Sequence, residues 1–315
     1  MYLEPRSSGE RENEDLARMS HLYNYESPDR GDVPLEIWDK RAEIWDASFH
    51  DNDDKKRSTT ERVNETMRFL RASGALLPDS VVVDAGCGVG HYAIALSEEV
   101  KEVLAIDISS QMIAHAKKRA EALKRENIAF MTQDFHTIDL EKQGFIRHFD
   151  LVFASLSPAS NGILGLEKLM AMSRKWCFVS TNAGQTNSLN RKIAEEIFDM
   201  EVPAGRDTRR MYALFNVLYL AGFTPYVYPY RQQKKRYYRV TEEDARHLLG
   251  RVLGQRQVNE EGTRRVLSWM AEHADDKGFV TEDSSHIYAW VLWDVNEQME
   301  RRVYPPDYPG FCEEK

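Results

Sequence analysis

The stretch VVVDAGCGVG, residues 81–90, constrains the fold of this chain more than any other. Three β-branched residues in a row are typical of a buried strand, and this run ends at the acidic Asp84. Glycines at every second position then allow a tight turn whose backbone can lie directly against a ligand. The amphipathic segment 91–100 follows and predicts a helix whose first N–H groups face that ligand. The sequence therefore predicts a ligand site on a turn between a strand and a helix.

Short apolar runs alternate with helical patterns beyond this motif. Met112, Ala116 and Ala120, for example, fall on one face of a helix. Such alternation is typical of parallel βαβ units, in which helices cover both faces of a sheet. We therefore predict a doubly wound α/β fold. The expected strands lie at residues 81–83, 103–106, 128–131, 151–154, 177–179, 225–230 and 286–295.

The formal net charge of −9 argues against a broad surface for nucleic acid, because affinity for a duplex depends on clustered Lys and Arg. One basic and aromatic cluster, RQQKKRYYR at residues 231–239, could bind single-stranded nucleic acid. In an acidic protein, and directly after an expected strand, a strand–loop edge is the more ordinary interpretation. We therefore expect nucleic acid to be an unlikely partner.

Three cysteines, Cys87, Cys177 and Cys312, lie far apart and predict neither a disulfide framework nor a metal site. They also form no pair suited to C5 methylation of RNA. The first residues are polar, and no apolar run approaches the roughly 20 residues that a bilayer requires. We expect a cytoplasmic protein with no membrane partner, and the sequence leaves its oligomeric state open.

Asp84 and the alternating glycines resemble the first motif of the class I S-adenosylmethionine-dependent methyltransferases. A nicotinamide-binding turn has a different spacing, since His91 stands where its last glycine would be. Further acidic residues follow the next two expected strands, as in this family. The resemblance implies cofactor contacts from Asp84, Gly86, Gly88, Gly90, Asp107, Ile108, Met112, Asp134, Phe135 and Ala154.

The resemblance also implies a role for each strand end. Asp107, about 20 residues after the glycines, would accept both ribose hydroxyls. Asp134 would accept the adenine amino group, and Phe135 would supply an N–H and an apolar wall. Ala154 would lie near the sulfonium and its methyl group. S-adenosylmethionine is thus the implied cofactor, and S-adenosylhomocysteine is its product.

The implied fold is a doubly wound, mostly parallel seven-stranded sheet with an N-terminal helical lid and a C-terminal helical insertion. We expect an N-terminal extension and lid over residues 1–57 and the cofactor-binding core over residues 58–185. Residues 186–300 would complete the sheet and carry helical insertions on the substrate side. Residues 301–315 would form a tail.

The aromatic segment WDKRAEIWD, residues 38–46, contains Arg41. In several small-molecule methyltransferases such a segment closes over the cofactor, and its arginine binds the cofactor carboxylate through the planar guanidinium. A solvated helix face is the alternative. No catalytic residue is assigned; His50, His91, Tyr92 and His136 are weak candidates for a general base.

The predicted activity is in-line transfer of a methyl group to an O, N, S or C nucleophile of a small molecule. LSPA, at residues 156–159, lacks the Asn/Asp-Pro-Pro-aromatic signature of enzymes that methylate exocyclic base nitrogens. Two alternatives stay open. One is a non-catalytic protein that binds S-adenosylmethionine as a regulator or scaffold, and the other is a methyltransferase acting on protein or RNA.

Overall fold

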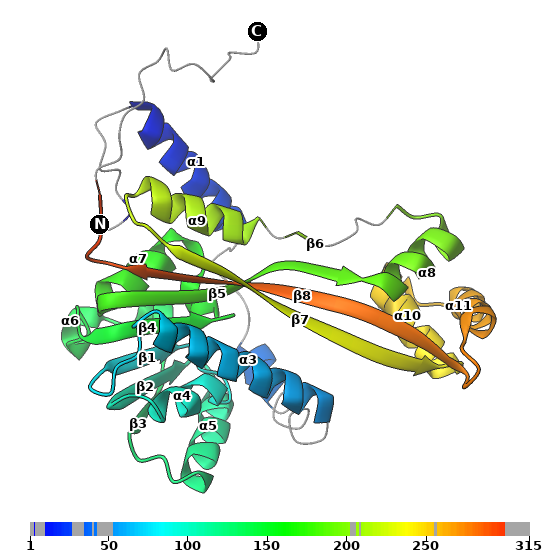
Figure 1. The fold of residues 1–315 in the computed structure, drawn as a ribbon, viewed down its shortest axis with the longest axis horizontal. Coiled ribbons are helices and arrows are strands. Elements are labelled where there is room, and N and C mark those ends of the chain that lie inside the picture. Colours follow the sequence, from blue (N-terminus) through cyan, green and yellow to red (C-terminus); the bar gives the residue numbers. More distant parts are fainter. Residues whose placement is uncertain are drawn as a thin grey trace. The chain divides into compact units, whose positions relative to one another are not determined.

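The computed structural model describes residues 3, 10–26, 35–39, 41–42, 53–201, 206–207, 209–254 and 257–299 (Figure 1). Its strands are β1 (Val81–Ala85), β2 (Glu102–Asp107), β3 (Ile128–Thr132), β4 (Phe149–Ser155), β5 (Ser173–Asn187), β6 (Arg206–Asp207), β7 (Tyr226–Arg239) and β8 (Phe279–Asp294). Its labelled α-helices are α1 (Glu10–Glu26), α3 (Asp53–Ala72), α4 (His91–Ser97), α5 (Ser110–Ala122), α6 (Leu140–Gln143), α7 (Gly162–Met172), α8 (Ser188–Phe198), α9 (Arg210–Leu220), α10 (Glu242–Leu253) and α11 (Glu260–His273). Two short 3-10 helices are η1 (Phe135–Thr137) and η2 (Pro158–Ser160).

The sheet has the order β3-β2-β1-β4-β5-β8-β7, and the two-residue β6 pairs with β5. Strands β1 to β5 pair in parallel along that order. β8 runs antiparallel to β5, because Val295 N–H donates to Lys175 near the start of β5 while Thr186 near its end meets Ser285 (Figure 1). The mostly parallel, doubly wound sheet predicted from the sequence is thus confirmed.

The order of the strands reverses at β1, which has β2 on one side and β4 on the other. In open α/β sheets the ligand binds at such a point, outside the carboxyl ends of the strands. Val83, Ala85 and Val152 are fully buried, as expected for strands that are covered on both faces. The core therefore holds the ends of β1 and β4 in fixed positions beside each other.

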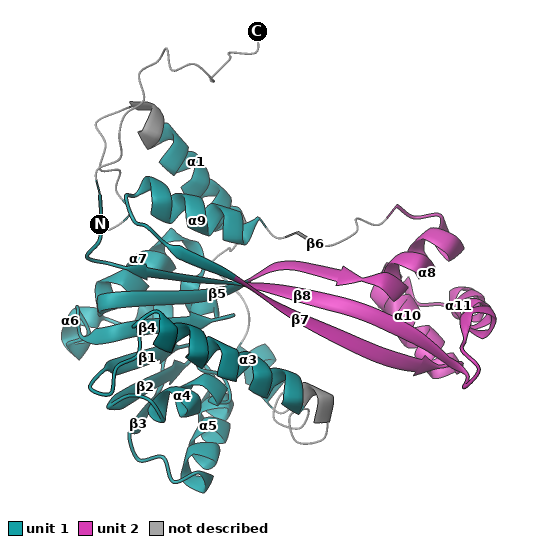
Figure 2. Cartoon of the chain, viewed as in Figure 1, with its two compact units in different colours: residues 1–181, 209–228, 289–315 teal, residues 182–208, 229–288 magenta. Residues whose placement is uncertain are grey.

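Two compact units make up the chain (Figure 2). Unit 1 comprises residues 1–181, 209–228 and 289–315, and unit 2 comprises residues 182–208 and 229–288. The boundaries that we drew from the sequence, at residues 57, 185 and 300, stay predictions.

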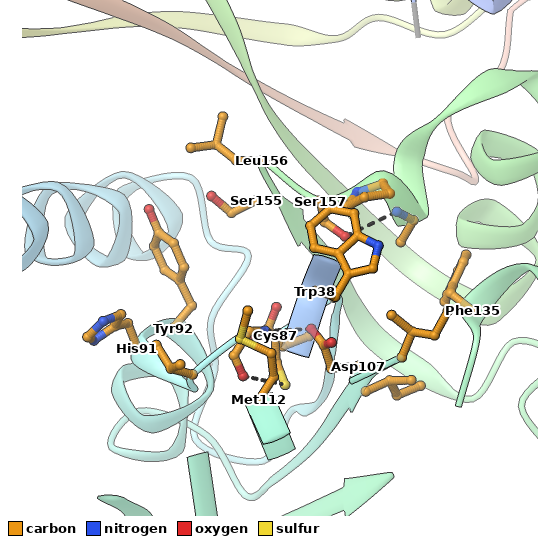
Figure 3. Close-up of a pocket in the computed structure, with 18 of the residues that line it drawn as sticks. Trp38, Cys87, His91, Tyr92, Asp107, Met112, Phe135, Ser155, Leu156 and Ser157 are labelled. Carbon is orange, nitrogen blue, oxygen red and sulfur yellow. Dashed lines mark hydrogen bonds between the residues drawn. The ribbon is translucent and has the colours of Figure 1, made fainter. Parts of the chain in front are cut away.

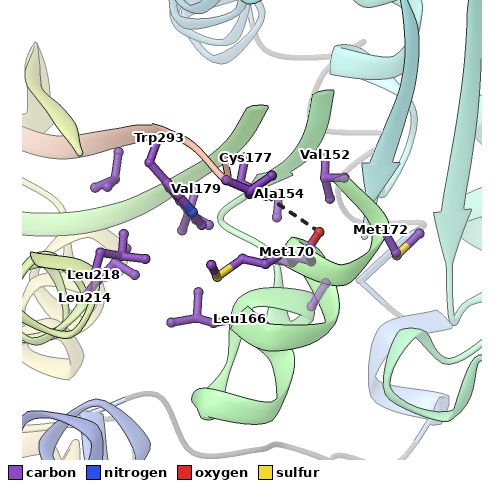
Figure 4. Packing of buried hydrophobic residues seen from close by; sticks show 14 of the residues in the cluster. Val152, Ala154, Leu166, Met170, Met172, Cys177, Val179, Leu214, Leu218 and Trp293 are labelled. Carbon is purple, nitrogen blue, oxygen red and sulfur yellow. Dashed lines mark hydrogen bonds between the residues drawn. The ribbon is translucent and has the colours of Figure 1, made fainter. Parts of the chain in front are cut away.

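Each unit has its own apolar core. In unit 1, side chains of β4, β5 and β8 pack against α7 and α9 (Figure 4). Labelled members of this cluster are Val152, Ala154, Leu166, Met170, Met172, Cys177, Val179, Leu214, Leu218 and Trp293. In unit 2, α8, α10 and α11 bury a second cluster that includes Ile193, Leu248, Leu249, Val266 and Met270.

Four elements extend well beyond the sequence-based expectation. α3 begins at Asp53, inside the segment assigned to the N-terminal extension. β5, β7 and β8 are longer than the apolar runs that marked them, and the basic cluster 231–239 lies within β7 rather than in a strand–loop edge. Their added residues are largely polar or charged and partly exposed, so they lack the apolar pattern by which we recognised strands.

Part of the N-terminal segment packs on other residues of unit 1. Tyr23 on α1 is fully buried, and its hydroxyl donates to the carbonyl of Ser160. Asn24 accepts from the N–H of Ile163 at 2.8 Å, at the start of α7. Ala42 packs with Val89 of the glycine turn. The predicted lid therefore has an anchored helix, α1, and a short segment that reaches the turn.

Candidate functional site

A cavity of 330 Å³ opens at the carboxyl ends of β1, β2, β3 and β4 (Figure 3). The turn after β1 and the start of α4 form its floor, and residues 155–159 after β4 form part of its wall. Trp38 lies over this turn, between Tyr92 and Phe135 in the view of Figure 3. Of the predicted cofactor residues, the cavity brings together Asp84, Gly86, Gly88, Asp107, Ile108, Met112, Asp134 and Phe135.

The glycine turn leaves no room for side chains at two of its positions. Gly86 has φ +78°, and a Cβ built there would overlap the hydroxyl oxygen of Ser157 and lie 2.9 Å from its Cβ. Gly90 has φ +84°, and its Cβ would lie 2.8 Å from that of Ala116 on α5. Gly86 therefore keeps the cavity floor bare, whereas Gly90, which does not line the cavity, allows α5 to approach the turn.

Asp107 connects the turn after β1 with the loop after β2. Its Oδ2 accepts from the N–H of Gly88 at 2.8 Å, and its Oδ1 accepts from the N–H of Ser109 at 2.9 Å. Burial raises the pKa of this carboxyl, while the backbone N–H groups of Ser109, Gly88 and Ile108 oppose that shift. Because each carboxylate oxygen can accept a second hydrogen bond, Asp107 has capacity left for a pair of hydroxyls.

Asp84 is buried at the end of β1, with 2% of its surface exposed. Among the described residues, its Oδ2 has no hydrogen-bond partner. Burial, and next the negative charge of Asp107, raise its pKa to about 8. A buried acid with an unpaired oxygen suits a cationic ligand, because an ion pair would offset its desolvation.

The end of the cavity next to β3 is largely apolar and contains one acid, Asp134. Asp134 caps η1, since its Oδ1 accepts from the N–H of His136 at 2.9 Å. Phe135 and Met112 are buried and Ile108 is 37% exposed, so they form a largely apolar slot beside that carboxylate. An acid beside an apolar slot fits the adenine assignment implied by the resemblance.

Three of the predicted cofactor residues do not line this cavity, and their assignment stays a prediction. Gly90 and Ala154 do not line the cavity; Ala154 is fully buried in the core, and its neighbour Ser155 faces the cavity instead. Arg41 does not line it either; its guanidinium lies over the ring of Trp38, 4.7 Å from the ring centre. Neighbouring residues of a strand point to opposite faces, so Ser155 reaches the cavity while Ala154 points into the core.

The weak candidates for a general base have defined surroundings, apart from His50, which lies outside the described residues. Both ring nitrogens of His91 lie within 3.1 Å of the Arg119 guanidinium. The hydroxyl of Tyr92 accepts from Nε of Arg62 at 3.2 Å. Nε2 of His136 donates to the carbonyl oxygen of Pro158 at 3.1 Å. All three candidate residues line the cavity.

Thr59 and Arg62 were missed by the sequence analysis. Both lie on α3, three positions apart, and both line the cavity. Residues at this spacing share a helix face, but α3 precedes the glycine motif and carries no motif itself. Only the packing of α3 beside α4 shows that this face belongs to the site.

Two further findings concern metals and membranes. Within the described ranges, no group of three or more His, Cys, Asp or Glu side chains could hold a metal ion. None of the described helices combines the length and the apolar character that a membrane span requires.

Comparison with known proteins shows that this chain is similar to methyltransferases. A family model described as a methyltransferase domain matches residues 76–243. Magnesium-protoporphyrin O-methyltransferase of Rhodobacter capsulatus is 37% identical over 114 residues, which cover 35% of this chain and 50% of the relative. A 23S rRNA (uracil-C(5))-methyltransferase of Alcanivorax borkumensis is 27% identical over 134 residues, covering 39% and 29%. The chain thus spans half or less of the length of these relatives.

Solved structures give matches of low overall similarity. A putative methyltransferase from Bacillus halodurans has a TM-score of 0.45 and 14% identity, with coverage of 73% of this chain and 97% of that one. Magnesium protoporphyrin IX methyltransferase from Synechocystis with bound S-adenosylmethionine has a TM-score of 0.40 and 19% identity, with coverage of 58% and 74%.

Proposed function

The chain belongs to the class I S-adenosylmethionine-dependent methyltransferases, and on that basis we propose that it transfers the methyl group of this donor to an O, N, S or C nucleophile of a small molecule. The observation that carries the proposal is the pair of acids at the bare glycine turn, of which Asp84 is buried and Asp107 is half-buried. Asp84 offers an unpaired oxygen, and Asp107 offers capacity for hydroxyls. This combination suits a cationic nucleoside.

We propose that the donor lies along the strand ends. The apolar slot at Asp134 and Phe135 would hold the adenine, Asp107 the ribose, and the turn at Gly86 the amino-acid part. The donor supplies an activated methyl group, because its sulfonium is a good leaving group. The protein then needs mainly to position the acceptor and to exclude water.

Charges in the cavity favour a small-molecule acceptor over a polyanion. Three acidic side chains line it, against one arginine among the lining residues of the described chain. Its volume of 330 Å³ falls in the range of about 300–1,000 Å³ that is common for small-ligand sites. A nucleic-acid channel would require clustered cations near the methyl group.

RNA C5-methyltransferases are also among the similar proteins, but their chemistry uses a cysteine thiolate that attacks covalently, and this cavity does not favour such a thiolate. Cys87 lines the cavity, but burial and then the negative charges of Asp84 and Asp107 raise the pKa of its thiol well above the ordinary value. A thiolate that attacks covalently needs a lowered pKa instead. Cys177 is buried in the core of unit 1.

The test is a screen for S-adenosylhomocysteine formation by the full-length protein, measured by mass spectrometry. One arm supplies a pool of small metabolites, a second supplies total RNA, and Asp107→Ala serves as the inactive control. We expect product in the small-molecule arm, above the background of hydrolysis, and none with the control. Product with RNA alone would contradict the proposed acceptor class. Donor binding without product in any arm would favour the non-catalytic alternative.

A further inference from the structure

Lys168 is a half-buried cation beside the segment 134–136, which forms one end of the cavity. It belongs to α7 and does not line the cavity itself. Its Nζ donates to the carbonyl oxygen of His136 at 2.8 Å and lies over the ring of Phe135, 5.8 Å from the ring centre. One ammonium group outside the cavity therefore holds two neighbouring residues of the cavity wall.

The sequence of α7 allows this close approach. Gly165 lies three positions before Lys168, so the two residues share a face of the helix. A Cβ at Gly165 would lie 2.7 Å from the carbonyl oxygen of Ala159 and 3.2 Å from Cε1 of His136. Leu169, next to Lys168, has no exposed surface and anchors α7 in the core of unit 1. Lys168 thus extends from a fixed helix that packs directly on the loops of the cavity wall.

The backbone of His136 connects Lys168 with Asp134. The carbonyl of His136 accepts from Lys168, and its N–H donates to Oδ1 of Asp134 at 2.9 Å. The ring of His136 is held as well, since its Nε2 donates to the carbonyl oxygen of Pro158 at 3.1 Å. His136 is therefore fixed through its backbone and its side chain, and its N–H sets the orientation of the Asp134 carboxylate.

Electrostatic attraction acts between the same groups. Burial lowers the pKa of Lys168, and the negative charges of Asp134 and Asp139 oppose that shift. Asp139 also pairs with Lys142, at 2.7 Å. The attraction between the Lys168 ammonium and the Asp134 carboxylate adds to the hydrogen bonds that pass through His136.

We propose that Lys168 is a positioning residue for the base of the methyl donor: through His136 it holds the carboxylate of Asp134 where that group accepts the amino group of adenine. This inference rests on the proposed function. Lys168 touches neither the donor nor the acceptor. Its contacts lie at residues 134–136, whereas Asp107 and the glycine turn would hold the ribose and the amino-acid part. Loss of Lys168 should therefore affect recognition of the base in particular.

Calorimetry with two ligands that differ only in the base tests the proposal. S-adenosylhomocysteine has an amino group on its purine ring, whereas S-inosylhomocysteine has an oxygen there, which cannot donate to a carboxylate. We expect the wild-type protein to bind S-adenosylhomocysteine roughly 10- to 100-fold more tightly, because a hydrogen bond to a charged acceptor is lost with the analogue. Lys168→Met keeps an unbranched side chain without its charge and donors, so this preference should fall to about threefold or less.

Lys142→Met is the matched control. Lys142 lies on α6, its side chain is 81% exposed, and it pairs with Asp139 outside the cavity lining. This variant removes the same charge close to η1 and should keep the preference of the wild type. Lys168→Arg restores a cation with N–H donors and should keep most of the preference. Thermal unfolding monitored by circular dichroism verifies that each variant is folded.

The ratio of the two affinities separates positioning from a purely structural role, which would weaken the binding of both ligands alike. If the wild-type protein binds neither ligand, the proposed function itself fails. If the wild type binds both ligands equally, the assignment of Lys168 is overturned while donor binding stands. The assignment is also overturned if folded Lys168→Met keeps the full preference, or loses affinity for both ligands to the same extent.

Discussion

At the scale of single residues, Asp84 illustrates how a ligand site is maintained at a cost in stability. Its pKa in the folded protein is about 8, against a value of 3.8 for the free side chain, because burial and the charge of Asp107 disfavour ionisation. At a pH between these two pKa values, the Asp84 carboxyl keeps its proton in the folded chain and has lost it in the unfolded chain. The stability contributed by this proton is full below the unfolded pKa and is lost as the pH rises toward 8.

We predict that Asp84→Asn removes this pH dependence. In the wild type, the free energy of unfolding should decrease by up to about 1.4 kcal/mol per pH unit between pH 5 and 8 through this one group. Urea unfolding of both proteins across this range, in the absence of ligand, measures the difference. Equal slopes in the two proteins would show that Asp84 ionises normally.

The second prediction at this scale concerns Asp107, whose two oxygens accept from the N–H groups of Gly88 and Ser109. Asp107→Ala should weaken binding of S-adenosylhomocysteine by about 2 kcal/mol or more, since it removes a charged acceptor of the ribose. Calorimetry measures this loss. Asp107→Asn keeps one acceptor oxygen and should lose less; unchanged affinity in a folded Asp107→Ala would refute the ribose assignment.

At the scale of elements, the glycine turn combines a backbone requirement with a close contact. Gly86→Ala meets both a positive φ and the side chain of Ser157, whereas Gly144→Ala meets a positive φ of +68° with nothing within 4 Å. Both variants should lose about 1 kcal/mol or more of stability through backbone strain.

Only Gly86→Ala should also lose donor affinity, because its methyl group displaces Ser157 at the cavity wall. Thermal melts and calorimetry on the two variants separate these effects. Equal donor affinity in both variants would show that the bare turn does not serve the ligand.

The elements also show what the sequence could and could not predict. β1 and β4 were located because strands covered on both faces are nearly continuous apolar runs, and β1 with its turn carries a motif besides. The outer parts of β5, β7 and β8 were missed because their residues are largely polar or charged and do not form an apolar run. Arg62 was missed for another reason: its helix contributes to the site through packing beside α4, which leaves no local signal.

At the scale of the whole molecule, the described residues that line the cavity belong to unit 1, while unit 2 has a core of its own. In unit 2 the buried Glu282 accepts from Arg251 at 2.5 Å and from the hydroxyl of Tyr238 at 3.2 Å. Removing Arg251 would leave the buried carboxylate with only the more distant Arg236, 3.9 Å from its other oxygen, and a poorly compensated buried charge is costly.

We predict that Arg251→Ala destabilises the protein by about 3 kcal/mol or more while it leaves donor binding within about twofold of the wild type, since the changed side chain shares no partner with the cavity. Urea unfolding and calorimetry on the folded variant give the two quantities. Arg246→Ala, which removes an exposed pair with Glu242, is the matched control for stability and should cost far less. A large loss of donor affinity in Arg251→Ala would show that the units are coupled.

The central claim is that the cavity at the strand ends of unit 1 binds the methyl donor, and a crystal structure of the full chain with S-adenosylhomocysteine tests it most directly. We predict adenine density beside Asp134 and Phe135, and ribose hydroxyls within hydrogen-bond distance of Asp107. Ligand density at a different place, or an empty cavity at saturating ligand, would contradict the claim.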